Sequence, residues 1–220
     1  MALVAALALV AGLAACGAPP SPYAAPPPAS RAAVRYLAVD SALGVVFATW
    51  SQLLYGATAT PGSTMFDVFV GNGPDPTGVQ KVVGYVRTVR AEVVFVWTPS
   101  PFLSSATAAS SEPLLGDLVL GLRHAGVRAV LVGNLAAVPG SRFDLAAVDA
   151  AIAATVRSSG GVLVDVRKAL AGTTGRPLFG GVFGGLTVTG NQLVAGAFYQ
   201  ALRQLPRLDQ GGSAPPRAST

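Results

Sequence analysis

The sequence predicts an α/β protein of three layers, α/β/α, built on a flavodoxin-like sheet of five parallel strands. Between residues 33 and 206, short apolar runs alternate with helix-like segments five times. The predicted strands are apolar at nearly every position, which is typical of a parallel sheet covered by helices on both faces. Because crossovers between parallel strands are right-handed, few topologies remain, and we expect the strand order 2-1-3-4-5.

Each element follows from a local pattern. Apolar runs rich in Val, Phe and Leu predict strands over residues 34–39, 66–71, 92–97, 127–134 and 162–166. Helical spacing and end signals predict helices over residues 44–56, 76–90, 112–126, 144–161 and 190–205. In the first helix one stripe holds Val46, Trp50, Leu53 and Leu54. The third begins with an acid and Pro113, as first turns do, and the fourth begins at a candidate cap, Asp144.

Both ends of the chain lie outside this pattern. Residues 1–16 resemble a bacterial lipoprotein signal peptide, because the apolar run ends in Leu-Ala-Ala and then Cys16, which would be lipidated. The alternative is a plain secretory signal with an incidental cysteine. Residues 17–32 form a Pro-rich linker, and residues 207–220 are expected to be a disordered tail. We therefore expect a domain over residues 33–206, secreted and anchored to the extracytoplasmic face of a bacterial membrane through Cys16.

The composition argues against several classes of function. The chain has 220 residues, of which 51% are apolar and 11% charged, and its net charge is +5. The basic residues are scattered, with no run longer than Arg167-Lys168, so nucleic acid is not expected as a partner. No GxGxxG motif follows the first strand, so no dinucleotide site is predicted. Neither a cofactor nor a metal site is expected, and a lone cysteine makes no internal disulfide.

The carboxyl ends of the strands are where such folds bind ligands, near the switch point in strand order. The residues expected there are Asp40-Ser41, the turn 71–73, residues 98–101, Gly133-Asn134 and the loop before the last helix. Several of them also suit structural roles. Asp40 can cap the following helix, and Asn72, Asn134 and Asp165 are ordinary turn residues.

In order and spacing, these pieces resemble the SGNH, or GDSL, hydrolase family. The first strand ends in Val-Asp-Ser where family members have Gly-Asp-Ser. There follow "WSQLL", "VGNGPDPTGVQ", "AEVVFVW", "HAGVRAVLVGNL" and "VLVDV", in the order of the corresponding family elements. The resemblance covers about residues 35–203. It implies a flavodoxin-like fold and, for intact members, esterase, lipase or acetyl-hydrolase activity.

The resemblance also implies a partial set of site residues. The family nucleophile falls on Ser41, and the backbone donor to the oxyanion falls on Gly71 or Gly73. The family's oxyanion asparagine has no match, because the residues after "VVFVW" are Thr-Pro-Ser-Pro, in which Ser100 is a weak donor.

The closing Asp-x-x-His motif of the family is also unmatched. It falls on Gly184 and Thr187, so the general base and the acid that orients it are both absent. The single histidine, His124, ends a predicted helix at the opposite edge of the sheet, where the helix dipole favours it. Lys81 or Lys168 would have to replace it in a Ser-Lys pair.

These departures predict an SGNH-like extracytoplasmic lipoprotein that is non-catalytic or strongly impaired. We expect it to bind a cell-envelope glycan or acyl ligand at the former active site. One alternative is an active esterase that uses Ser41 with an unconventional base. Another is a structural or assembly lipoprotein of the cell envelope. The sequence does not predict the oligomeric state.

Overall fold

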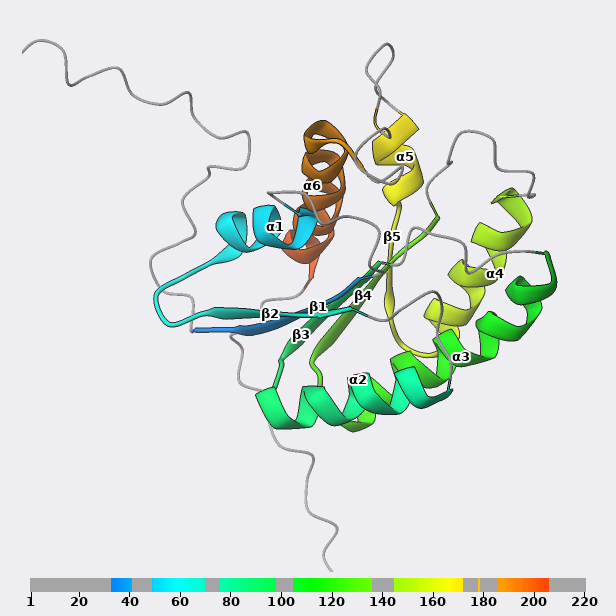
Figure 1. Cartoon of the computed structure of the whole chain (residues 1–220), viewed down its shortest axis with the longest axis horizontal. Coiled ribbons are helices and arrows are strands. Elements are labelled where there is room, and N and C mark those ends of the chain that lie inside the picture. The colour runs from blue at the N-terminus through cyan, green and yellow to red at the C-terminus, as the bar shows by residue number, and fades with distance from the viewer. Residues whose placement is uncertain are drawn as a thin grey trace, which may run out of the picture.

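Five parallel strands form one central sheet in the computed structural model of the chain (Figure 1). The structure describes residues 33–40, 49–69, 76–97, 105–135, 145–171, 178 and 186–205. The strands are β1 (Arg35–Asp40), β2 (Thr64–Phe69), β3 (Val93–Trp97), β4 (Ala129–Gly133) and β5 (Val162–Val164). All pairings are parallel and the order is β2-β1-β3-β4-β5, which confirms the predicted fold class and topology.

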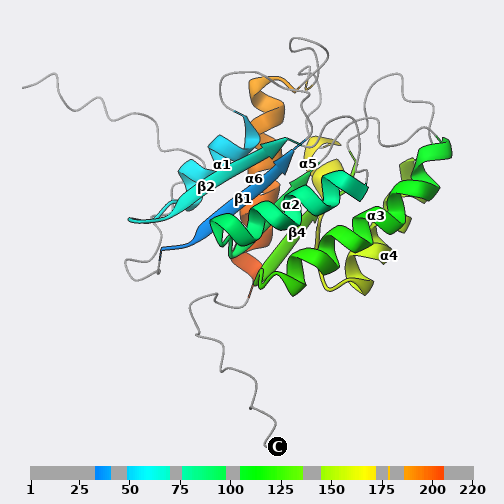
Figure 2. The same cartoon turned by 60° about the horizontal axis from the view of Figure 1, so that its bottom comes forward.

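The helices of the described residues cover both faces of this sheet. They are α1 (Trp50–Thr58), α2 (Pro76–Val89), α3 (Ser105–His124), α4 (Leu145–Ser158), α5 (Val166–Ala171) and α6 (Val188–Gln204). Helix α6 packs against α1 and α5 on one face, and α3 packs between α2 and α4 on the other (Figure 2). Within the described ranges, no helix combines the length and apolar character needed to cross a membrane.

Each face of the sheet has its own apolar core, because alternate residues of a strand point to opposite faces. In β1, Tyr36 and Ala38 join the core under α1 and α6, which includes Phe198. Leu37 and Val39 join the core under α2, α3 and α4. Burial on both faces explains why the strands are apolar at nearly every position.

The starts of two helices differ from the sequence-based expectation. Helix α1 begins at Trp50, not at residue 44, because Thr49 is extended and forms a capping box with Gln52. Helix α3 begins at Ser105, so the exposed Pro113 lies inside the helix rather than in its first turn. A proline in a helix interior removes one backbone hydrogen bond, which is why the sequence pattern favours a first-turn position for it.

Helix α5 was not predicted at all. Val166, assigned to the fifth strand, is instead the first residue of this helix. The preceding residue, Asp165, accepts the backbone N–H of Lys168 at 3.0 Å and so caps the helix. A six-residue helix is too short to show a helical period in the sequence.

Candidate functional site

The candidate site is the carboxyl edge of the sheet, where the strands end side by side. Asp40 ends β1 and lies in register with Trp97, the last residue of β3. Asn134 follows β4 directly, and Asp165 follows β5. The structure therefore brings together three of the polar side chains that the sequence placed at this edge.

Asp40 is held in place by an aromatic side chain. The indole Nε1 of Trp50 donates to Oδ2 of Asp40 at 2.8 Å. This indole is 1% exposed, stacks on Phe198 with ring centroids 4.9 Å apart and meets Trp97 edge-on at 6.2 Å. A charge-assisted hydrogen bond from a ring packed so tightly orients the carboxylate. Asp40 thus links the end of β1, immediately before Ser41, to the start of α1.

Asn191 ties the start of α1 to the start of α6, and sequence reasoning missed it. Its Oδ1 accepts the backbone N–H of Trp50 at 2.9 Å, across 141 residues of chain. Its Nδ2 donates to the carbonyl oxygen of Thr187 at 3.1 Å. The signal for it was present in the sequence, because Asn191 lies on the stripe that continues through Val194 and Phe198. A polar residue on the apolar stripe of a helix marks a buried hydrogen-bonding role.

Thr187, the position at which the sequence resemblance predicts the family's histidine, serves as the N-cap of α6. Its hydroxyl oxygen accepts a hydrogen bond from the backbone N–H of Gly190 at 3.2 Å. The same hydroxyl donates to the carbonyl oxygen of Leu178 at 3.3 Å. A hydroxyl engaged in this way holds the helix end and offers no base for proton abstraction. The remaining predicted positions lie outside the described residues; they are Ser41, Gly71, Gly73, Ser100, Gly184 and the lipidation residue Cys16.

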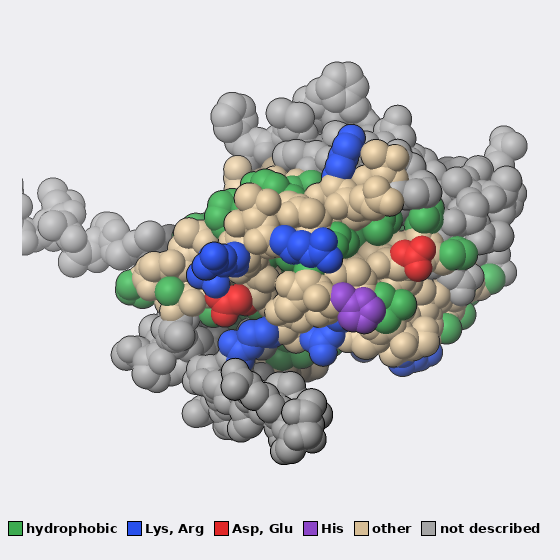
Figure 3. Space-filling view, turned by 90° about the horizontal axis from the view of Figure 1, so that it is seen from below, with side chains coloured by type: hydrophobic (Ala, Val, Ile, Leu, Met, Phe, Trp, Pro, Cys, Tyr) green, Lys and Arg blue, Asp and Glu red, His purple; other side chains and the backbone are tan. Residues whose placement is uncertain are grey.

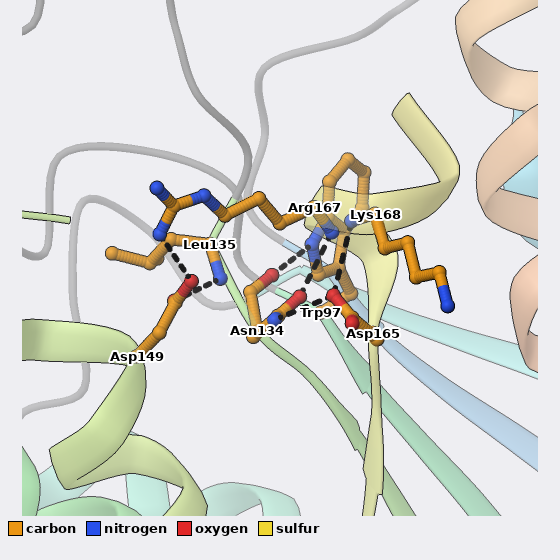
Figure 4. Close-up of polar contacts among 7 residues, drawn as sticks. All are labelled: Trp97, Asn134, Leu135, Asp149, Asp165, Arg167 and Lys168. Atoms are coloured by element: carbon orange, nitrogen blue, oxygen red, sulfur yellow. Dashed lines mark hydrogen bonds and ion pairs between the residues drawn. The ribbon is translucent and has the colours of Figure 1, made fainter. Parts of the chain in front are cut away.

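A second polar network lies at the carboxyl ends of β4 and β5 (Figure 4). Nδ2 of Asn134 donates to Oδ1 of Asp165 at 3.0 Å, and Oδ1 of Asn134 accepts the backbone N–H of Arg167 at 2.9 Å. The indole of Trp97 donates to the backbone carbonyl of Asn134 at 3.1 Å. Asn134 is 7% exposed, so this network positions the start of α5 and supports the structural reading of Asn134 and Asp165.

An ion pair extends this network toward α4. Nη1 of Arg167 lies 2.9 Å from Oδ2 of Asp149, whose Oδ1 accepts the backbone N–H of Leu135 at 3.1 Å (Figure 4). The side chains of Arg167 and Asp149 are 36% and 14% exposed. Because water reaches this pair, its main effect is to orient the chain after β4 rather than to add much stability.

The candidate replacement bases lie on three different helices. His124 ends α3 and is exposed, and the chain then turns through Gly126 into the start of β4. The whole of β4, about 13 Å at 3.3 Å per residue, separates that edge from the candidate site. Lys81 and Lys168 have exposed side chains, on α2 and α5 respectively.

The described part of the site supplies hydrogen-bonding groups rather than an acid–base pair. Asp40 and Asp165 both bind donors from neighbouring elements. Among the residues that the structure describes, no three metal-ligating side chains come together. Such an arrangement can recognise a polar ligand but does not by itself activate a nucleophile.

Comparisons with solved structures identify the fold. The chain superposes on a lipase/acylhydrolase from Enterococcus faecalis with a TM-score of 0.59 and 11% identity, over 77% of this chain and 95% of that one. A family 3 carbohydrate esterase from Clostridium thermocellum gives 0.60 and 15%, over 77% and 94%. A member of the lipolytic G-D-S-L family from Veillonella parvula gives 0.56 and 12%, over 79% and 100%.

Sequence comparisons show much less. No family model matches the chain. Two curated relatives, both NAD(P)H-quinone oxidoreductase subunit 2 from strains of Prochlorococcus marinus, are 31% identical over 101 residues, or 44% of this chain. The chain spans only 18% of their length. Since the solved structures match over nearly their whole length, the chain has the α/β/α fold of the SGNH, or GDSL, hydrolases.

Proposed function

We propose that this protein is an extracytoplasmic lipoprotein that binds a cell-envelope glycan or acyl ligand at the carboxyl edge of an SGNH fold and does not hydrolyse it. The attachment to the membrane would be a lipid on Cys16, as the signal-like sequence before it indicates. The structural neighbours support the ligand class, because their names include a carbohydrate esterase and a lipase/acylhydrolase.

The observation that carries the proposal is the role of Thr187. In a serine hydrolase a base must take the proton of the nucleophile. At the position expected for that base, the Thr187 hydroxyl instead caps α6 through Gly190. The chain's one histidine, His124, lies at the far end of β4. Removal of a triad member leaves only the small part of the acceleration that binding and oxyanion contacts provide.

A hydrolysis assay tests the catalytic half of the proposal. The full chain and its Ser41→Ala variant are incubated with p-nitrophenyl acetate and with acetylated xylan. We expect equal rates for the two proteins, at the background rate of each substrate. Turnover that is lost in Ser41→Ala would overturn the proposal in favour of an active esterase with an unconventional base.

A binding assay tests the other half. Thermal unfolding is followed with and without solubilised envelope glycans and short-chain acyl esters, because a ligand that binds only the folded state raises the midpoint. We expect a shift that Asp40→Ala removes and that Gln200→Ala, an exposed position on α6, retains. No shift with any ligand, or an equal shift in both variants, would contradict binding at the carboxyl edge. Mass spectrometry of the exported chain, with Cys16→Ser as control, tests the lipid anchor.

A further inference from the structure

The opposite edge of the sheet carries a concentrated positive charge. Among the described residues, seven exposed arginines lie where strands begin or helices end, and we call them the arginine edge: Arg35, Arg87, Arg90, Arg123, Arg128, Arg157 and Arg203. The exposed His124 belongs to the same edge. In the view from below, blue Lys and Arg side chains are spread across the face around the purple histidine and outnumber the red ones (Figure 3).

The topology explains why this cluster cannot be recognised in the sequence. In a parallel sheet every crossover helix runs antiparallel to the strands, so the helices end at the edge where the strands begin. Helices α2, α3, α4 and α6 each have an arginine in the last turn. These arginines are far apart along the chain, so they form no basic run in the sequence.

Glu92 is the described carboxylate that pairs with this edge, whereas the exposed Asp67 and Asp117 lie within β2 and α3, away from the ends of those elements. Glu92 lies 3.3 Å from Arg35 and 3.8 Å from Arg128. Three described aspartates, Asp40, Asp149 and Asp165, belong instead to the networks of the carboxyl edge. The domain is therefore polarised, with its excess positive charge on the side away from the candidate site.

Helix dipoles account for only part of the pattern. A cation in the last turn of a helix is stabilising, which suits Arg87, Arg123, Arg157 and Arg203. Arg35 and Arg128 belong to no helix, so the dipole does not explain them.

At Arg90 an arginine occupies a backbone position whose conformation disfavours it. Helices α2, α3 and α4 end in the same way, with a left-handed residue followed by an amide that bonds five residues back. That residue is Gly126 after α3 and Gly160 after α4, with φ of 91° and 76°, but after α2 it is Arg90, with φ of 53°. Glycine adopts this conformation without the steric penalty that arginine incurs.

The chain also enters the domain at this edge. The linker 17–32 leads through residues 33 and 34 into Arg35, the first residue of β1. A linker of sixteen residues in the extended polyproline II conformation spans at most about 50 Å. A domain on such a tether stays close to the membrane in which its lipid is embedded.

We propose that the arginine edge docks on the anionic phospholipid headgroups of the membrane that carries the anchor, and so turns the candidate site away from the bilayer. The choice of a membrane as the anionic partner depends on the lipid anchor of the proposed function. The existence of the basic surface does not depend on that anchor. Each arginine near an anionic surface strengthens binding about fivefold, since the interaction is worth about 1 kcal/mol. Several together hold a tethered domain in one orientation.

Vesicle sedimentation tests the surface separately from the anchor. Full-length chain carrying Cys16→Ser, which has no lipid, is mixed with vesicles of phosphatidylcholine alone or with about 30% phosphatidylglycerol. Arg90→Gly with Arg157→Gln alters the arginine edge. The matched control, Lys81→Gln with Lys168→Gln, removes the same net charge from α2 and α5. All proteins share the same N-terminus, so binding to neutral vesicles corrects for its apolar segment.

We expect the edge variant to lose about 25-fold in partitioning to anionic vesicles and the control to lose less than about threefold, with both effects suppressed by salt. Arg90→Gly alone should bind more weakly while its unfolding midpoint rises by about 2–4 °C, which excludes misfolding as the cause. Equal losses in the two double variants would overturn the proposal. The proposal would also be overturned if the edge variant bound vesicles as well as the unmodified protein but bound duplex DNA more weakly. Ligand binding at the carboxyl edge should be the same in the arginine variants as in the unmodified chain, so a failure here leaves the proposed function standing.

Discussion

Asn191 is the residue whose replacement tests the described part of the site most directly. Asn191→Ala removes the acceptor of the Trp50 backbone N–H, in a contact that is buried. A buried donor left without a partner costs about 1–3 kcal/mol, and the lost bond to the Thr187 carbonyl adds about 0.5–1.5 kcal/mol. The Thr187 carbonyl keeps the backbone N–H of Asn191 as a helical partner, so it is not stranded.

The free energy of unfolding should therefore fall by about 1.5–4.5 kcal/mol, a large part of the 5–15 kcal/mol typical of a domain. Urea unfolding followed by tryptophan fluorescence measures this loss, because both tryptophans, Trp50 and Trp97, are buried. Gln200→Ala is the control, since Gln200 is exposed on the same helix, and it should change stability by less than about 0.5 kcal/mol. The reasoning is refuted if Asn191→Ala unfolds within about 0.5 kcal/mol of the unmodified chain.

Three further changes have defined outcomes in the same urea assay. Gly133→Ala should destabilise by about 1–3 kcal/mol, because its Cβ would lie 2.5 Å from Cδ1 of Trp97 and 2.9 Å from Cγ2 of Val166. Gly84→Ala, in open space on α2, should instead stabilise by about 0.5–1 kcal/mol, and equal signs for the two would contradict the packing at Gly133. Asp165→Ala should cost about 1–2 kcal/mol by uncapping α5 while Asp165→Asn costs less; identical losses would argue against the cap. Trp50→Phe should cost about 1.5–3 kcal/mol through the lost bond to Asp40, and a smaller loss in Asp40→Asn than in Asp40→Ala would support that bond.

The sheet could be predicted from the sequence because its cause is local. A strand buried on both faces must be apolar throughout, and this pattern is visible without any knowledge of contacts. The start of α1 is set by the reciprocal hydrogen bonds of Thr49 and Gln52. The apolar stripe continues upstream of these residues in the sequence, so the predicted helix began too early. The long α3 was shortened in the prediction because Pro113 is more typical of a first turn than of a helix interior.

The candidate site was predictable in position but not in its connections. Strand ends converge by topology, so Asp40, Asn134 and Asp165 were expected at one edge. Their partners come from distant elements, and a bond such as that between Asn191 and the Trp50 amide leaves only an indirect trace in the sequence. The arginine edge shows the same limit, because residues scattered along a chain meet only after the helices have been assigned directions.

The closing helix has a consequence for the order of events during folding. Helix α6 supplies Val194, Phe198 and Leu202 to the core that also holds Trp50 and Phe95. Until the last of these residues is available, α1 and α5 are the described helices that cover this apolar face of the sheet. Contacts across such long stretches of chain form slowly, because the ends of a large loop must first meet. A chain truncated before α6 would expose that face and aggregate, whereas the complete chain can bury it in one step.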